Sequence, residues 1–129
     1  MTHAFSVTTR SLPTAVVLTI RGDLDAATAP EVHVHVAGLA LPPDTVLVVD
    51  LAELRFCDSS GIAALIAAHN VAQTANAYLT LAAVPPQLSR ALGMIGLTDF
   101  FITHPTTERA LATQPPPAPA TGDQDSVSE

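Results

Sequence analysis

Short apolar runs bounded by turn residues recur along the first half of the chain. Residues 4–10 and 14–22 are rich in Val, Ile, Thr and Leu, and a turn with a proline separates them. Such runs are typical of strands, so these two are predicted to lie in a sheet. Residues 45–52 form a continuous apolar run, which is expected of a central strand buried on both faces.

A helix is expected between the second and third of these runs. Thr28 and Glu31 have the spacing of a capping box, and Pro30 falls in the first turn, where its missing N–H does no harm. The helix is predicted over residues 29–41. Because Val32–Val36 also alternates as a strand would, a strand remains the alternative for this segment. The expected buried residues of the helix are Val32, Val36 and Leu39.

The second half of the chain continues the alternation of strands and helices. A long helix is predicted from Ser59 to about Asn76. The elements expected after it are a strand over 78–84, a short helix over 87–97, a strand over 99–103 and a helix over 106–112. This order predicts an α/β sandwich with a mixed sheet.

The end of the chain differs in composition from the rest. Residues 114–129 are rich in Pro and small polar residues, with Val127 as the only large apolar side chain. Such a segment buries too little apolar surface to offset the entropy cost of ordering it. We therefore expect one domain over residues 1–113, followed by a disordered acidic tail.

Charge and hydropathy narrow the possible partners. The 129 residues carry 5 basic and 12 acidic side chains, for a net charge of −7. This balance disfavours nucleic acid and anionic membrane surfaces and favours a protein with a basic patch. The chain has no apolar run near the roughly 18 residues that span a bilayer, and no signal-peptide pattern at its start. We expect a soluble protein of the cytoplasm.

Cysteine and histidine usage indicates neither a disulfide nor a metal centre. Cys57 is the only cysteine, so no internal disulfide can form, and a lone cysteine is usually a small core residue. His33 and His35 have the spacing of a metal-binding pair on a strand, but no third ligand is evident. The chain also lacks a glycine-rich phosphate loop. We predict no metal and no cofactor.

Two serines follow a carboxylate where a strand-like run ends at Cys57 and the long helix begins. Asp58, Ser59 or Ser60 could cap the unpaired N–H groups of the first helical turn. A hydroxyl at this position is also accessible to a kinase, and the helix dipole would tolerate a phosphate. A catalytic serine is disfavoured because the nucleophile-elbow glycines are incomplete and His69 lies about 15 Å along the helix.

The long helix after Ser59 carries no charged residue as far as Asn76. Its expected core stripe is Ile62, Leu65 and Ile66. An uncharged, Ala-rich outer face suits contact with a partner, although other helices of the same domain would cover it equally well. If the outer face contacts a partner, the residues expected in the docking surface are Ala64, Ala67 and Asn70.

The stretch VVDLAELRFCDSSGIAALI resembles the central signature of the STAS domain of bacterial anti-sigma factor antagonists. In that signature an apolar strand and Asp-Leu precede Asp-Ser-Ser/Thr-Gly, which opens a helix. Three further stretches are similar in order and spacing: LTIRGDLDAATAPEV, LTLAAVPPQLSRALGMIGL and DFFITHPTTERAL. The resemblance covers roughly residues 4–113, with Asp23 in place of a Glu. It implies a STAS-type fold with a four- to five-stranded mixed sheet and about four helices.

The resemblance also implies a non-enzymatic, partner-switching function. In the family, the unmodified antagonist binds an anti-sigma factor that is also a serine kinase, and thereby frees a sigma factor. The kinase phosphorylates the serine after the Asp, here Ser59, and a metal-dependent serine phosphatase reverses the reaction. The alternative is a STAS subunit of a lipid-transport or stress-signalling complex without a sigma-factor circuit. The partner-binding residues that the resemblance implies are Asp23, Asp25, Asp58, Ser60 and Gly61.

Overall fold

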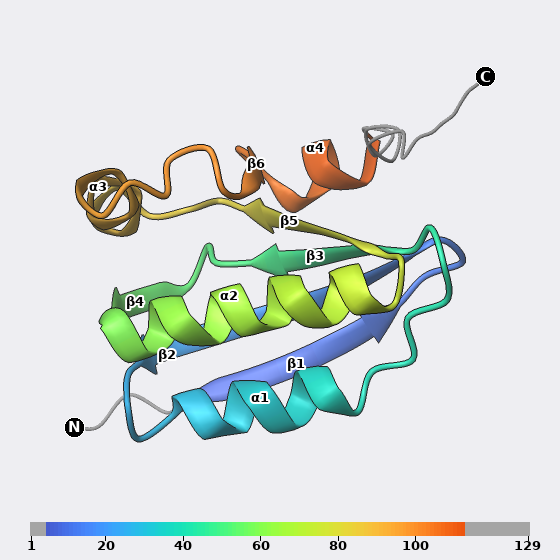
Figure 1. Ribbon diagram of the computed structural model, residues 1–129, viewed down its shortest axis with the longest axis horizontal. Helices are drawn as coiled ribbons and strands as arrows, with labels where there is room; N and C mark the ends of the chain where they lie inside the picture. The colour runs from blue at the N-terminus through green and yellow to red at the C-terminus, as the bar shows by residue number, and fades with distance from the viewer. Residues whose placement is uncertain (1–4, 113–129) are drawn as a thin grey trace.

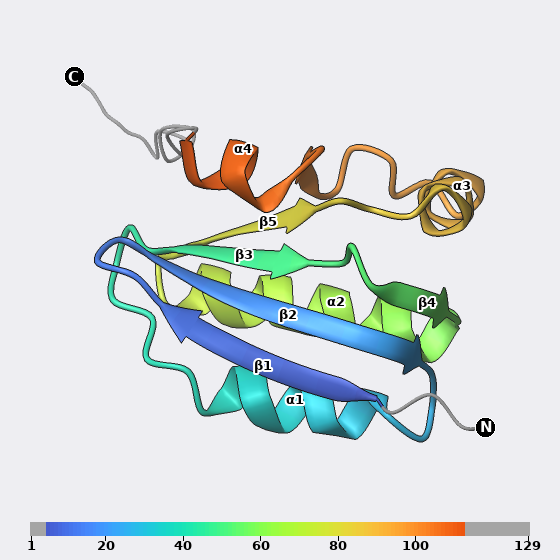
Figure 2. The ribbon, with the colours of Figure 1, turned by 180° about the vertical axis from the view of Figure 1, so that it is seen from behind.

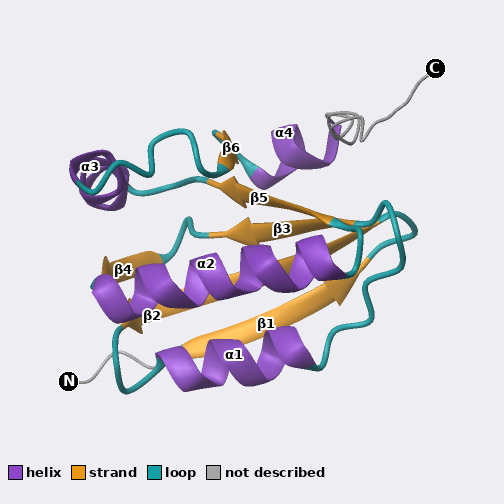
Figure 3. Ribbon diagram, in the orientation of Figure 1, coloured by secondary structure: helices purple, strands orange, loops and turns teal. Residues whose placement is uncertain are grey.

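The computed structural model describes residues 5–112, which form one sheet with helices packed against it (Figure 1). The elements in chain order are β1 (Ser6–Ser11), β2 (Ala15–Leu24), α1 (Ala29–Ala37), β3 (Val46–Asp50), β4 (Leu54–Cys57), α2 (Ser59–Thr74), β5 (Tyr78–Ala82), α3 (Pro86–Met94), β6 (Ile102–His104) and α4 (Thr107–Ala112). The predicted α/β alternation is confirmed, as Figure 3 shows. The predicted tail lies outside the described residues.

The sheet is mixed, as predicted. Its strand order is β1-β2-β3-β5-β6, with β1 antiparallel to β2 and the other pairs parallel. It has 6 strands rather than four or five, because the short β4 pairs with the end of β2. Since β2, β3 and β5 run in the same direction, their carboxyl ends lie at one edge of the sheet.

A bulge in β2 allows it to pair with two strands in succession. Its first part pairs with β3, and its register with β4 shifts between Gly22 and Asp23. Gly22 has φ of 95°, a conformation that glycine adopts without the clash of a Cβ atom. Beyond the bulge, Leu24 pairs with Cys57. The loops after β2 and β4 therefore leave the sheet side by side.

The two faces of the sheet are covered differently. Helices α1 and α2 lie over one face, whereas the view from behind shows the strands uncovered by these helices (Figure 2). Leu18 and Leu47 point to the α1–α2 side and are fully buried. Neighbouring residues of a strand point to opposite faces. Val17 and Val48 accordingly pack on the other side, against Ala110 of α4.

Two local predictions for the first helix are wrong. α1 ends at Ala37 and does not continue to residue 41. At this end, the N–H of Gly38 donates to carbonyl groups of the last helical turn. The capping box does not form, because the hydroxyl of Thr28 donates to the carbonyl of Asp23 at 2.7 Å instead. The segment is nevertheless a helix and not a strand. Its predicted buried residues Val32 and Val36 are buried, and Leu39 is half-buried.

Candidate functional site

Helix α2 begins directly after β4, and Asp58 is its capping residue. The Oδ1 atom of Asp58 accepts hydrogen bonds from the N–H groups of Ser60, at 2.9 Å, and Gly61, at 3.1 Å. A carboxylate at this position satisfies two unpaired donors and also interacts favourably with the helix dipole. Of the three candidate caps, the structure therefore uses the carboxylate, and neither serine hydroxyl is required for this purpose.

The two serines differ in accessibility. Ser59 is exposed as the first residue of α2, whereas Ser60 is half-buried. Within residues 5–112, no hydrogen bond involves the hydroxyl of Ser59. The hydroxyl of Ser59 is thus open to solvent and to an incoming protein.

Acidic side chains gather at the same edge of the sheet. Asp25 and Asp58 directly follow Leu24 and Cys57, which pair in register, and the N–H of Asp58 donates to the carbonyl of Leu24 at 3.2 Å. Asp25 also accepts a hydrogen bond from the N–H of Thr28 at 3.2 Å, which holds the loop after β2 in place. The predicted site residues that are half-buried here are Asp23, Asp25, Asp58 and Ser60.

Two of the predicted partner-binding residues are buried. Ala64 is only 1% exposed and packs in the main core beside Leu65 and Ala68, so its place in the docking surface is wrong. Gly61 is also buried, and a Cβ atom there would lie 2.8 Å from the carbonyl oxygen of Leu24. Gly61 therefore allows α2 to approach β2 closely, and a partner cannot reach it from outside.

The outward side of α2 forms a stripe that starts at Ser59. Its exposed or half-buried residues, mostly three or four positions apart, are Ser59, Ala63, Ala67, Asn70, Val71 and Thr74. Ala67 and Asn70 were predicted here, whereas Ala63 and Val71 are additions. Towards the end of the helix, Asn70, Val71 and Thr74 line a shallow hollow of about 380 Å³. The stripe is uncharged and joins the hydroxyl of Ser59 to this hollow.

His33 and His35 lie on α1, and His69 lies ten residues after Ser59 on α2. His69 is half-buried, with its ring 4.6 Å from that of Phe100, and His33 is exposed on α1. His35 places Nδ1 2.9 Å from the carbonyl of Glu31 one turn earlier. Residues 5–112 contain no group of three His, Cys, Asp or Glu side chains that could hold a metal ion.

We expect the thiol of Cys57 to react slowly in the native protein. Burial, and secondly the negative charge of Asp58, raise the pKa of Cys57 to about 12. Because the thiolate is the reactive form, native protein should react with Ellman's reagent at least ten times more slowly at pH 8 than urea-unfolded protein. Equal rates for the native and unfolded chains would contradict this expectation.

The same pKa difference predicts a loss of stability in alkali. An unfolded thiol ionises near its ordinary pKa of 9.0, whereas the folded one holds its proton to about 12. Above pH 9 the unfolded state therefore binds fewer protons, so the free energy of unfolding falls as the pH rises. Urea titrations between pH 8 and 10 should show this fall, and Cys57→Ala should reduce it.

No helix within residues 5–112 has the length and hydropathy needed to cross a membrane.

Known protein families and solved structures were compared with this chain and its fold. The family described as "Mlab, STAS domain" matches residues 7–103. No curated protein matches the chain. The structure is similar to an anti-sigma factor antagonist from Mycobacterium paratuberculosis, with 23% identity, 88% of this chain and 98% of that chain covered, and a TM-score of 0.72.

Two further solved structures have the same fold. One is the phosphorylated form of the Bacillus cell fate determinant SpoIIAA, with 19% identity, 84% and 97% of the two chains covered, and a TM-score of 0.59. The other is a sulfate transporter family protein from Wolinella succinogenes, with 18% identity, 78% and 84% covered, and a TM-score of 0.67. These likenesses concern the fold, which anti-sigma factor antagonists share with a protein of another class.

Proposed function

Because this chain belongs to the STAS-domain family, we propose that it is an anti-sigma factor antagonist whose partner binding is switched off by phosphorylation of Ser59. The observation that carries the proposal is the exposed hydroxyl of Ser59 next to Asp58. Because the Asp58 carboxylate caps α2, the Ser59 hydroxyl is not needed as a cap. The proposed partners are an anti-sigma factor that is also a serine kinase, and a metal-dependent serine phosphatase. The protein would act in the cytoplasm, with neither enzyme activity nor a cofactor of its own.

The proposed docking surface has an acidic end and an uncharged side. The acidic end consists of Asp23 and Asp25 at the end of β2, and of Asp58, Ser59 and Ser60 at the start of α2. A basic patch on the partner would complement these carboxylates and speed association. The uncharged side is the α2 stripe with Ala67 and Asn70, where small side chains allow a partner to approach the helix closely.

A capture experiment followed by site mapping tests the function. Full-length protein and its Ser59→Asp variant are used in parallel to capture partners from a native lysate. We expect the wild-type protein alone to retain an ATPase related to histidine kinases. Incubation with that kinase and ATP should then phosphorylate Ser59, as mapped by mass spectrometry. Phosphate mainly on the half-buried Ser60 would defeat the assignment.

A charge on the α2 stripe should weaken kinase binding. Asn70 is exposed, so Asn70→Arg should leave the fold intact while placing an unpaired charge in the interface, with an expected loss of about tenfold or more in affinity. Val34→Arg on α1 is the matched control, since Val34 is 72% exposed and lies outside the stripe. Titration calorimetry compares the two. Equal affinities would place the docking surface elsewhere.

The alternative is a STAS subunit of a lipid-transport or stress-signalling complex without a sigma-factor circuit. The observation that keeps this alternative open is that a sulfate transporter family protein has the same fold. The same capture experiment separates the two functions. Recovery of a transporter component with the wild-type protein, at equal yield with Ser59→Asp, would support the alternative.

A further inference from the structure

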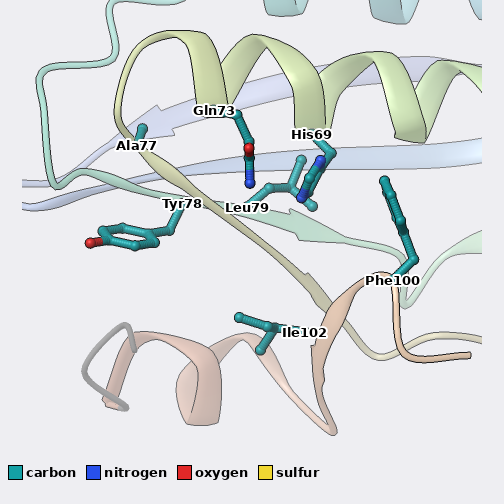
Figure 4. A pocket seen from close by; sticks show the side chains of 7 residues that line it. All are labelled: His69, Gln73, Ala77, Tyr78, Leu79, Phe100 and Ile102. Carbon is teal, nitrogen blue, oxygen red and sulfur yellow. The ribbon is translucent and has the colours of Figure 1, made fainter. Parts of the chain in front are cut away.

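A small cavity lies between α2 and the outer edge of β5, at the opposite end of α2 from Ser59. It has a volume of about 100 Å³, and its lining includes His69, Gln73, Tyr78, Phe100 and Ile102. Figure 4 shows His69 and Gln73 extending from α2 between Tyr78 and Phe100, with Ile102 opposite them. Sites for small organic ligands usually measure about 300–1,000 Å³, so this cavity fits a single ring-sized group better than a metabolite.

The cavity exists because β6 is short. β6 pairs only with Thr80, Leu81 and Ala82 of β5, so within the described chain nothing pairs with the outer edge of β5 at its first two residues, Tyr78 and Leu79. The chain before β6 instead packs Phe100 against His69, with the ring centroids 4.6 Å apart. An extended segment could therefore lie beside Tyr78, in the position next to β5 that β6 occupies further along the strand.

The lining combines apolar surface with hydrogen-bond donors. Phe100 and Ile102 are 39% and 41% exposed and both line the cavity, so they present apolar surface there. Gln73 offers its amide NH₂ as a donor, and Tyr78 lines the cavity with its ring pointing away from Gln73. The Nδ1 atom of His69 is buried and has no hydrogen-bond partner among the described residues. A suitable occupant is thus an extended apolar segment that supplies carbonyl acceptors.

We propose that the proline run of the chain's own C-terminal segment, Pro115–Pro117, occupies this cavity. Proline has no N–H, so such a run presents carbonyl acceptors and apolar rings, and proline-rich segments bind aromatic-lined grooves in many proteins. A pyrrolidine ring has the size that the cavity admits. The carbonyls would accept hydrogen bonds from the amide NH₂ of Gln73.

The described chain ends within reach of the cavity. Leu111 of α4 packs in one cluster with Val46, and Val46 pairs in register with Tyr78. Neighbouring strands are about 4.8 Å apart, so the vacant position beyond Tyr78 lies roughly two such spacings from Val46. A polyproline segment advances about 3.1 Å per residue, which places Pro115–Pro117 about 9–16 Å of chain beyond Ala112. Ala112 directly follows Leu111, so the length of this link is of the same order as the distance from that cluster to the cavity.

Nuclear Overhauser contacts in the full-length labelled protein test this proposal. We expect contacts between proline ring protons of residues 115–117 and the rings of Tyr78 and Phe100. A full-length variant with Pro115→Ala, Pro116→Ala and Pro117→Ala should lose these contacts and shift the amide resonances of residues 78, 79, 100 and 102. Asp123→Asn is the control in the same segment, and it should leave contacts and shifts unchanged.

A change on the cavity side gives an independent readout. Gln73 is exposed on α2, so Gln73→Glu should fold normally while its carboxylate repels the proline carbonyls and abolishes the contacts. The proposal is wrong if wild-type protein shows no such contacts or if the triple variant retains the wild-type shifts. Contacts that disappear on dilution would also overturn it, since they would show that a second copy supplies the prolines.

Discussion

Phosphorylation of Ser59 is expected to lower the affinity for the anti-sigma factor by a hundredfold or more without altering the fold. The phosphate adds about −1.5 to −2 charges at neutral pH. Asp58 is adjacent, and Asp25 follows the strand residue paired with Cys57, so the new charge enters an acidic cluster. For charges about 7 Å apart and an effective dielectric constant of roughly 20–80, each charge pair costs about 1–5 kcal/mol.

The fold itself should tolerate this charge. The N-terminus of α2 stabilises an anion by about 0.3–2 kcal/mol, and the cap made by Asp58 does not involve Ser59. In the complex, in contrast, the phosphate on Ser59 would have to lose its water shell at the interface, which weakens binding of the partner. Since 1.4 kcal/mol is tenfold in affinity, about 3 kcal/mol is enough for a hundredfold change. The effect should be smaller at high salt.

Calorimetry with unmodified and phosphorylated protein measures the affinity change. Ser11→Asp is the control, because Ser11 is exposed on β1 at the opposite end of the sheet and should change the affinity less than threefold. The far-UV spectrum should stay the same, with amide shifts confined to residues near 57–63. Widespread shifts across the sheet would show that phosphorylation acts by refolding, which is contrary to this mechanism.

Gly61→Ala should destabilise the protein by about 2–3 kcal/mol. A Cβ atom would lie 2.6 Å from Sγ of Cys57 and 2.8 Å from the carbonyl oxygen of Leu24. The carbonyl cannot move freely, because it accepts the hydrogen bond from the N–H of Asp58. Overpacking of this kind typically costs about 1–3 kcal/mol, and a backbone obstacle places the cost in the upper part of that range.

Gly93→Ala is the matched control for this substitution. Gly93 is exposed within α3, and its Cβ atom would meet only the hydroxyl of Thr98 at 3.4 Å. Alanine favours a helix over glycine by up to about 1 kcal/mol, so this variant should be as stable as the wild type or more so. Urea unfolding of both variants gives the difference, and equal midpoints would contradict the close approach of α2 to β2.

Elements with a strong hydrophobic pattern were predictable from the sequence. Residues 45–52 predict a buried strand because Val46–Val49 are four consecutive apolar residues, and β3 falls within this range. The β1–β2 hairpin followed from two strand-like runs around a proline turn. The position of Ser59 at the start of a helix followed from the change of pattern after Cys57. In each case local composition and tertiary packing favour the same structure.

Features that depend on packing were not predictable. α2 is so rich in Ala that one side differs little from another in hydropathy, so Ala64 was assigned to the surface although it is buried. Thr28 and Glu31 have the spacing of a capping box, but the box does not form. The Thr28 hydroxyl instead donates to the carbonyl of Asp23, at the bulged end of β2. Likewise, a strand was expected over residues 99–103, but β6 begins only at Ile102, and Phe100 packs against His69.

The separation of the helix cap from the proposed phosphorylation site affects how such a domain can diverge in evolution. Asp58 alone holds the first turn of α2, so exchange of Ser59 for Ala, Thr or Asp leaves the folding determinants intact. A gene duplicate can therefore lose or invert its regulation by a single substitution and still yield a folded binding protein. Exchange of Asp58 would instead cost about 0.5–2 kcal/mol of stability and would be exposed to selection for folding. Residue 59 can therefore change as regulation changes, whereas residue 58 is constrained by its role in stabilising the fold.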